Sequence, residues 1–587
     1  MRRLLANRTA LGLLALTLLA LALRLLAWGW NAARPLGGDE REYLDLAIHL
    51  AQGKGYYDLQ FMRPPLFPAG LAALVWLFDG DLPLLRLANA LVSAATVPLV
   101  FWWTRELGAA WGAAPGAPWA AAWRRAAWWA AGLAALSYTL ALNATELLTE
   151  TVFLAGLTVC FALLARAGRT LAPRRILGAG AALGLLCLIR SVALPLGLLG
   201  AAWLILLAWR GARPRARALL PGLLLLAGLL LPVLPWTARN AARYGGFILI
   251  DTTGQENLWL DNDPRGRDVV KAELYAMGER RIERAGLASQ RGLAAIAADP
   301  GWVAAKAWRE FGRFWALEQA DDLSQRRAIW LPAAEVWLRL ALGDGLWLLV
   351  LLAGAWGLAA LPNAPGTAGL RALLALWAAY TVFTGALFHV ELRYRLPLFP
   401  VLLPAAGWIL ALAAARLARR WRRLGDWLSG RSAIVVARPA SAAQQHSAPA
   451  QADQPGAARR TQSQGQADQP NAAAPTLGGP QADQPGAAAH PGEPGADRPN
   501  AAGRDAGQPG ADQPGAAGED SAPAQADQPN AAAPTLGGPQ ADQPGAASHP
   551  GEVQADQPNA AGRDAGEPGA DRRGAARGWR ALAARAL

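Results

Sequence analysis

Residues 11–28 read LGLLALTLLALALRLLAW, a stretch in which Arg24 is the only charged residue. A helix of about 20 apolar residues crosses the hydrocarbon core of a bilayer, so this stretch predicts a membrane span. It is too long for a signal peptide and lacks a small-residue cleavage site, which favours an uncleaved span. Nine more apolar stretches follow it: 83–103, 126–142, 147–164, 176–189, 192–209, 219–235, 345–361, 371–388 and 398–415. We therefore expect an all-α polytopic membrane protein with about ten spans.

Arginine clusters predict the orientation of these spans, because cytoplasmic loops carry an excess of positive charge. The clusters on one side of the membrane are Arg2, Arg3 and Arg8; Arg105, Arg124 and Arg125; Arg166, Arg169, Arg174 and Arg175; Arg210, Arg213, Arg215 and Arg217; and Arg416, Arg419, Arg420, Arg422 and Arg423. The alternation holds only if the apolar run 66–78 does not cross; its 13 residues are short for a span and predict an interfacial or re-entrant helix. We expect both termini in the cytoplasm and outer-face loops at 31–82 and 236–344.

The composition excludes several classes of protein. With 53% hydrophobic and 17% charged residues, the chain is not one large soluble enzyme. Its two cysteines, Cys160 and Cys187, lie in apolar stretches, which excludes a disulfide-stapled secreted protein. The net charge of +13 comes from arginines between apolar stretches, a membrane-topology signal, so we expect no nucleic-acid partner.

Residues 438–587 differ from the rest of the chain. Ala, Gly, Pro, Asp and Gln dominate them, and the segment 466–493 recurs almost letter for letter at 525–552. Such a segment has too few apolar residues to build a core, which predicts disorder. We expect a membrane-embedded domain at 1–437 and a disordered repeat tail at 438–587 without a catalytic role.

A dense polar cluster, GGDEREY at 37–43, follows the first apolar stretch. Asp39 and Glu40 lie at the predicted outer interface, where partial desolvation raises the pKa of a carboxylate toward the range of a general base. A structural interpretation competes with this one. Asp39 at the start of a helix, with Glu42 three residues later, is typical of a capping box. The residues alone leave both open.

Several motifs occur together in one order along residues 1–415. They are GGDEREYLDLA (37–47), RPPLFP (63–68), ELLTETVF (146–153), LIRS (188–191), PWTARNAARYGGFILIDTTGQENLWLDNDP (235–264) and HVELRYRLPLFP (389–400). In these motifs the chain resembles the bacterial branch of glycosyltransferase family 39, GT-C membrane enzymes related to protein O-mannosyltransferases and the aminoarabinose transferase. It departs from that family at Ala241, where family members often have Tyr.

The resemblance implies a GT-C helical bundle that transfers a sugar, with inversion, from a polyprenyl-phosphate donor to a hydroxyl or amine on the outer face. Asp39 would then be the catalytic base, with Glu40 as its neighbour. The leaving phosphate needs cations, and the guanidinium fork suits phosphate well. The residues expected at the donor phosphate are Arg63, Arg239, Arg393, Tyr394 and Arg395. Arg63 and Arg239 could equally be interfacial side chains that snorkel to the membrane surface.

Other polar residues of the motifs are secondary candidates: Glu146, Glu150, Arg190 and His389. Two acids four apart could bind a divalent metal or cap a helix, so metal is left unassigned, and no other cofactor is assigned. The expected partners are the polyprenyl-phosphate sugar, membrane lipids and an acceptor in the cell envelope. The main alternative is a polytopic transporter or lipid flippase. A transporter should show internal repeats and charges near the middle of the membrane, whereas residues 1–437 show no internal repeat and their polar clusters lie at the predicted outer edge.

Overall fold

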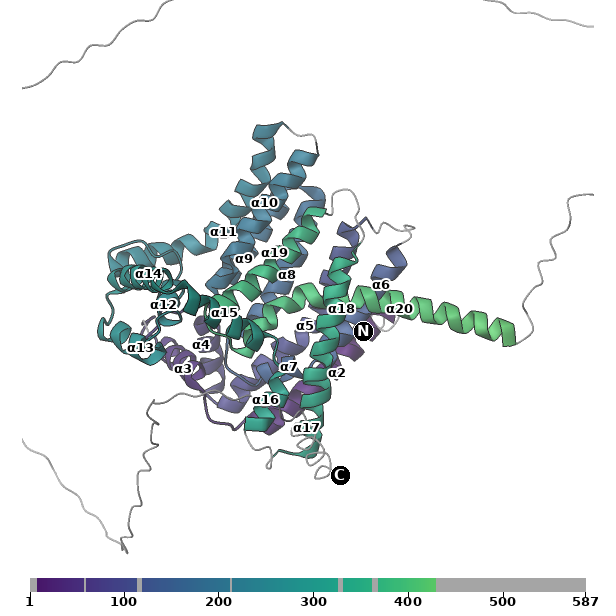
Figure 1. The fold of residues 1–587 in the computed structure, drawn as a ribbon, viewed down its shortest axis with the longest axis horizontal. Helices are drawn as coiled ribbons and strands as arrows, with labels where there is room; N and C mark the ends of the chain where they lie inside the picture. Colours follow the sequence, from purple (N-terminus) through teal and green to yellow (C-terminus); the bar gives the residue numbers. More distant parts are fainter. Residues whose placement is uncertain are drawn as a thin grey trace, which may run out of the picture. The chain divides into compact units, whose positions relative to one another are not determined.

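The computed structural model describes residues 8–57, 60–112, 119–211, 214–325, 331–361 and 368–428. Within these residues every regular element is a helix and no strand occurs (Figure 1). The expected fold class, an all-α polytopic membrane protein, is confirmed. The segment 438–587 lies outside the described residues, so the tail and the division into two domains remain predictions.

Eight helical stretches among the described residues are long and apolar enough to cross a membrane. They are formed by α2 (Arg8–Asn31), α5 (Leu82–Ala110), α8 (Glu150–Thr170), η1 (Ser191–Ala193) with α10 (Leu194–Arg210), α11 (Arg215–Tyr244), α17 (Ala333–Leu338) with η2 (Arg339–Gly345) and α18 (Leu346–Ala359), α19 (Ala368–Leu387), and η3 (Leu392–Leu398) with α20 (Phe399–Leu428). These stretches correspond to eight of the ten expected spans.

The other two expected spans, 126–142 and 176–189, fall on shorter helices. Helix α6 (Ala120–Leu136) ends at Ser137, whose extended backbone breaks the helix and whose hydroxyl caps the short α7 (Tyr138–Asn143). Helix α9 (Pro173–Cys187) has 15 residues. Among the described residues eight helical stretches therefore reach the length of a span where ten spans were expected: the break at Ser137 shortens α6, and α9 covers most of a run that has only 14 residues.

The short helix α9 nevertheless packs closely against the long helix α11 through two glycines. A Cβ at Gly180 would lie 2.2 Å from the carbonyl oxygen of Leu225, and a Cβ at Gly184 would lie 2.2 Å from that of Leu229. Only glycine permits this approach of α9 to α11, since no other residue lacks a Cβ. Small residues at such contacts are typical of helix packing in membranes.

Residues 66–78 form the short helix α4 (Leu66–Phe78), as the sequence predicts. It packs against α3 (Gly38–Ala51), where the rings of Tyr43 and Phe67 meet edge to face with centroids 5.0 Å apart. Left-handed backbone at Asp79 ends α4. This packing fixes the position of the polar cluster at the start of α3.

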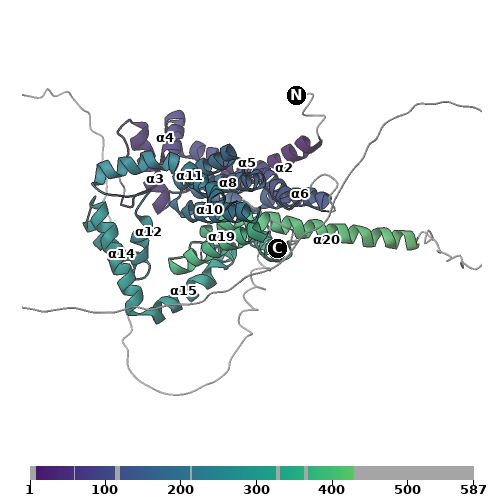
Figure 2. The same ribbon diagram turned by 90° about the horizontal axis from the view of Figure 1, so that it is seen from above.

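The expected outer loop 236–344 is largely helical. Its helices are α12 (Thr253–Leu260), α13 (Arg267–Ala276), α14 (Arg281–Ala298), α15 (Pro300–Phe314) and α16 (Glu318–Gln325). Figure 2 shows α12, α14 and α15 together beside the spanning helices. Arg284 on α14 donates to the Glu256 carboxylate on α12 at 2.5 Å and to the carbonyl of Gln60 at 2.7 Å. These bonds hold the outer helices to the loop between α3 and α4.

Candidate active site

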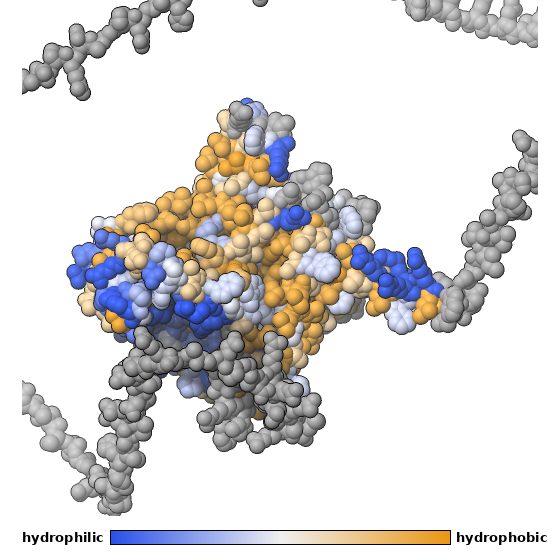
Figure 3. Space-filling view, viewed as in Figure 1, coloured by the Kyte–Doolittle hydropathy of each residue, from blue (hydrophilic) through white to orange (hydrophobic). Residues whose placement is uncertain are grey.

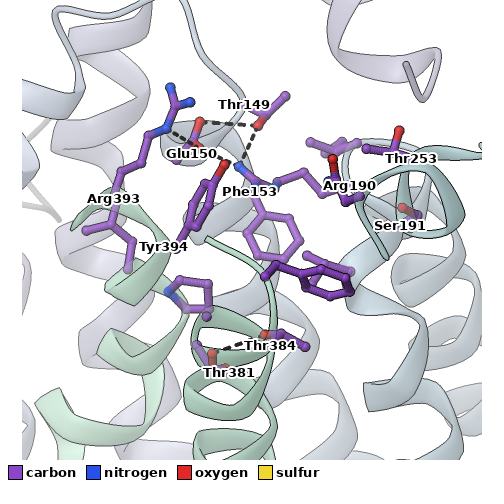
Figure 4. Close-up of a pocket in the computed structure, with 18 of the residues that line it drawn as sticks. Thr149, Glu150, Phe153, Arg190, Ser191, Thr253, Thr381, Thr384, Arg393 and Tyr394 are labelled. Carbon is purple, nitrogen blue, oxygen red and sulfur yellow. Dashed lines mark hydrogen bonds and ion pairs between the residues drawn. The ribbon is translucent and has the colours of Figure 1, made fainter. Parts of the chain in front are cut away.

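A cavity of about 590 Å³ lies between the start of α3, the start of α8, α19 and η3 (Figure 4). Its charged and hydrogen-bonding lining residues include Asp39, Arg63, Thr149, Glu150, Arg190, Asp251, His389, Arg393 and Tyr394. Its apolar lining residues include Phe153, Ile189, Val192, Leu194, Trp377, Phe383, Leu387 and Phe388. The cavity thus combines a cluster of cations and carboxylates with a long apolar wall.

Asp39 lies between two arginines in this cavity. Its Oδ1 accepts from Nη2 of Arg63 at 2.9 Å, and its Oδ2 accepts from Nη2 of Arg393 at 2.9 Å. Burial alone would raise the pKa of Asp39, but the charges of Arg63 and Arg393 outweigh it and lower the pKa below its usual value. The carboxylate is therefore ionised at neutral pH, and 37% of its side chain is exposed.

Glu40, next in the chain, has a structural position. It is buried, its Oε2 accepts from the backbone N–H of Gly37 at 2.9 Å, and its Oε1 accepts from that of Leu147 at 2.9 Å. Arg34 lies 2.8 Å from the same carboxylate. The helix α3 is therefore capped by Gly37 and Glu40, and the expected pair Asp39 and Glu42 does not form the capping box. Since Asp39 has no capping role, its carboxylate is available to the cavity.

Arg63 and Arg393 each hold a second carboxylate besides Asp39. Arg63 donates to Glu42 at 2.7 Å, and Arg393 lies 2.7 Å from Glu391. Both guanidinium groups are mostly buried. The structure thus brings together, from three distant parts of the sequence, the base candidate and two of the arginines expected at the donor phosphate.

Arg190 and Glu150 extend this cluster into the cavity. Arg190 pairs with Glu150 and donates to the hydroxyl of Thr149 at 3.0 Å (Figure 4). Glu150 also lies 3.4 Å from Nε of Arg393. The ring of Tyr394 lies beside both guanidinium groups, 5.7 Å from each. One buried carboxylate therefore orients two cations toward the same space.

Two of the expected phosphate-binding arginines lie elsewhere. Arg395 is 1% exposed, and it donates to the carbonyl of Ala316 at 2.8 Å and to Glu318 at 2.9 Å. Arg239 packs over the rings of Tyr56 and Trp236, at 5.0 and 4.7 Å from their centroids. Neither side chain lines the cavity. The lining of the cavity therefore does not support a donor-phosphate role for either residue: Arg395 is held by Ala316 and Glu318, and Arg239 contacts the aromatic rings around it.

His389 joins the outer helices to the site. Its Nδ1 lies 2.8 Å from Nη1 of Arg267 and 3.1 Å from Oδ2 of Asp261, and its Nε2 lies 3.3 Å from the hydroxyl of Tyr394. The Tyr394 hydroxyl donates to Glu391 at 3.2 Å. Since Glu391 also pairs with Arg393, these polar contacts connect Arg393 of the cavity to Arg267 at the start of α13.

Asp39 also lines a second cavity, of about 900 Å³. Its polar lining residues are Asn31, Arg34, Asp39, Glu40, Asn143, Thr145, Glu146, Arg313, Glu318, Gln319, Arg339, Glu391 and Arg393. No aromatic side chain is among its described lining residues. Asp39, Leu148 and Arg393 line both cavities, so the carboxylate stands where an apolar-walled space meets a polar one.

Glu146 lies in this second cavity. Partial burial raises its pKa to about 7, with 37% of the side chain still exposed, against the opposing charge of Arg34, whose Nη2 is 3.7 Å away. Glu150, four residues later, faces the first cavity and is held by Arg190. The two acids therefore do not converge on one point. Within the described residues no group of three or more His, Cys, Asp and Glu side chains could hold a metal ion.

Asp251 is a cavity residue that the sequence did not single out. Burial raises its pKa, although the Ser191 hydroxyl and the backbone N–H of Thr253 donate to its carboxylate, the latter at 3.0 Å. It belongs to the run FILIDTTG at 247–254. The signal available in the sequence was a single acid directly after an apolar run and directly before two threonines.

No known protein family matches the chain, and no curated protein sequence matches it. Among solved structures it is similar to the archaeal oligosaccharyltransferase AglB from Archaeoglobus fulgidus in complex with an inhibitory peptide and a dolichol-phosphate. The TM-score is 0.43 and the identity 14%, over 72% of this chain and 52% of that one.

A second structure, the Archaeoglobus fulgidus oligosaccharyltransferase tethered to an acceptor peptide, gives a TM-score of 0.40 and 14% identity over 69% of this chain and 49% of that one. The chain spans about half the length of both archaeal enzymes. ArnT from Cupriavidus metallidurans bound to undecaprenyl phosphate gives a TM-score of 0.30 and 16% identity over 68% of this chain and 78% of that one. At these values the function is inferred from the geometry of the site.

Proposed function

We propose that this protein is a membrane glycosyltransferase that moves a sugar from a polyprenyl-phosphate donor to a hydroxyl or amine of an acceptor. One observation carries the proposal: Asp39 stands between Arg63 and Arg393 at the junction of an apolar-walled cavity and a polar cavity. The motifs that resemble glycosyltransferase family 39 supply the residues of this cluster. The resemblance therefore supports the same function.

The first cavity suits a lipid-linked phosphate. Its volume of about 590 Å³ is within the usual range of small-molecule sites, and its aromatic and aliphatic wall fits an isoprenoid chain. Arg63, Arg190 and Arg393 line it with the forked donors that bind phosphate oxygens in pairs. Phe383, on the α19 side of this lining, is exposed at the surface of the protein. A lipid chain in the cavity therefore has a way out toward the bilayer.

The second cavity suits a hydrophilic acceptor. It offers carboxylates, amides and guanidinium groups for hydrogen bonds, and it reaches Asp39 without passing through the apolar wall. An acceptor hydroxyl or amine placed there would approach the sugar from the side opposite to the phosphate. That approach leads to inversion at the anomeric carbon.

In the proposed reaction the acceptor oxygen or nitrogen forms a bond to the anomeric carbon as the bond from that carbon to the phosphate oxygen breaks. Asp39 receives the acceptor proton. The arginines stabilise the charge that develops on the departing phosphate. When the guanidinium groups of Arg63 and Arg393 turn to the donor phosphate, they withdraw from Asp39, and its pKa rises toward that of a working base. The donor would thus activate the base that it needs.

The experiment is a transfer assay on the purified full chain in proteoliposomes with a panel of labelled polyprenyl-phosphate sugars. The proposal predicts label transferred to an envelope extract and free polyprenyl phosphate in equal amount for at least one donor. Lipid movement across the bilayer without cleavage of any donor would support the flippase alternative and contradict the proposal.

A further inference from the structure

Helix α20 continues beyond the helices that it packs against. Up to its middle it is tightly packed, since a Cβ at Gly357 of α18 would lie 2.1 Å from the carbonyl oxygen of Ala405. Every side chain from Arg416 to Gly425 is exposed. Figures 1 and 2 both show this end of α20 extending past its neighbours. The helix therefore persists here without burying a face against the rest of the protein.

Four arginines lie along one face of this end: Arg416, Arg419, Arg420 and Arg423, here called the arginine ridge. Their spacing of three, four and seven residues places them one above another on the helix. Like charges at these spacings repel and destabilise a helix. Among the described side chains, which on α20 end at Gly425, no acidic side chain pairs with any of the four. A bound anion would therefore reduce the repulsion among the four arginines and stabilise this end of the helix.

A groove runs beside the ridge. It has a volume of about 730 Å³ and is lined by the four arginines together with Trp129 of α6 and Leu410, Ala413, Ala414 and Leu417 of α20. Figure 3 shows the hydrophilic end of α20 next to apolar surface. The groove thus offers a charged rim and an apolar floor, which matches a phosphate headgroup attached to acyl chains.

We propose that the arginine ridge and its groove bind an anionic phospholipid, with the headgroup phosphate on the arginines and an acyl chain along Trp129 and Leu410. The position along the helix agrees with the surface of a membrane. Arg416 lies 17 residues beyond Phe399, a rise of about 26 Å, which is close to the thickness of a hydrocarbon core. The site is thus at the opposite membrane face from Arg393, and it does not depend on the proposed catalytic function.

The segment 438–587 is another source of negative charge, because its acidic residues outnumber its basic ones. It is poor in large apolar side chains, however, and the floor of the groove is apolar. A phospholipid matches both the rim and the floor, whereas the acidic segment matches only the rim.

The test uses the full chain purified in neutral detergent and titrated with phosphatidylglycerol or with phosphatidylcholine, with binding read from native mass spectra. The variant carries R416Q, R419Q, R420Q and R423Q together. The matched control carries R174Q, R175Q, R210Q and R217Q, which remove four exposed arginines at other helix ends. A further form ends at Ala437.

Each arginine near an anionic lipid surface contributes about fivefold to binding, so loss of four should weaken phosphatidylglycerol binding by about 10²-fold or more. The control variant and the form ending at Ala437 should bind phosphatidylglycerol as the full chain does, and phosphatidylcholine should bind weakly to all. Equal losses in the two variants would show a diffuse basic surface and overturn the proposal. Tighter lipid binding by the shortened form would show that the acidic segment occupies the ridge, which would overturn it as well.

Discussion

Arg393→Lys tests whether the donor phosphate is bound by the forked guanidinium group or only attracted by a positive charge. The Arg393 guanidinium lies 2.9 Å from Asp39, 2.7 Å from Glu391 and 3.4 Å from Glu150. Lysine keeps the charge but has no planar fork, so it cannot hold these carboxylates and two phosphate oxygens together. One charge-assisted hydrogen bond contributes about 1.5–3 kcal/mol. Loss of one such bond to the donor should raise the donor KM roughly 10- to 100-fold.

The assay is steady-state kinetics with the donor and the acceptor varied in turn. The acceptor KM should change less than about threefold, because the proposed phosphate contact is made only with the donor. Arg395→Lys is the matched control, since Arg395 belongs to the same RYRLP motif but is buried against Ala316 and Glu318. It should lower the melting temperature and leave the donor KM near that of the unchanged protein. A rise in the acceptor KM alone, or equal changes in both variants, would refute the placement of the donor phosphate at Arg393.

Three further outcomes are expected. Glu40→Gln should lower stability by about 1–3 kcal/mol, measured by denaturation in detergent, because the buried Arg86 and the partly exposed Arg34 lose the carboxylate charge that they share; unchanged stability would contradict its structural role. The raised pKa of Glu146 means that the folded state favours the protonated carboxyl, so its contribution to stability is present below about pH 4.5 and is lost as pH rises through about 7. Glu146→Gln should abolish this loss. If the melting temperatures of the variant and the unchanged protein followed parallel curves from pH 5 to 8, the raised pKa would be contradicted. Cysteine in place of Lys54 should react with an impermeant reagent added outside intact cells, and cysteine in place of Arg210 should not; the reverse labelling would invert the proposed membrane orientation.

The sequence predicted the fold well where apolar runs are long. The helix at 66–78 and eight of the ten expected spans agree with the structure. The two exceptions have different causes: hydropathy does not show that the helix at 126–142 is interrupted at Ser137, whereas the run 176–189 is itself shorter than a span. Ser137 ends one helix and its hydroxyl caps the next one, and a hydropathy profile does not report such a cap.

The site was predicted in part. Asp39, Arg63 and Arg393 meet as their motifs implied, although 354 residues separate Asp39 from Arg393. Arg395 and Glu40 show the limit of such prediction. Arg395 lies two residues from Arg393 but is bound to Glu318, and Glu40, which lines the second cavity, has both carboxylate oxygens bound by backbone N–H groups. Which face of a helix is buried depends on packing partners that the local sequence does not specify.

The role of Asp39 as the proton acceptor is the central claim, and turnover by the Asp39→Asn protein tests it most directly. Asparagine keeps the size of the side chain but cannot accept the proton. Because Gly37 and Glu40 cap α3, and because Glu42 and Glu391 still pair with Arg63 and Arg393, the melting temperature should fall only modestly. The account predicts a fall in kcat of about 10²–10⁴-fold with a labelled polyprenyl-phosphate sugar. An Asp39→Asn protein that turns over within a fewfold of the unchanged enzyme would contradict it.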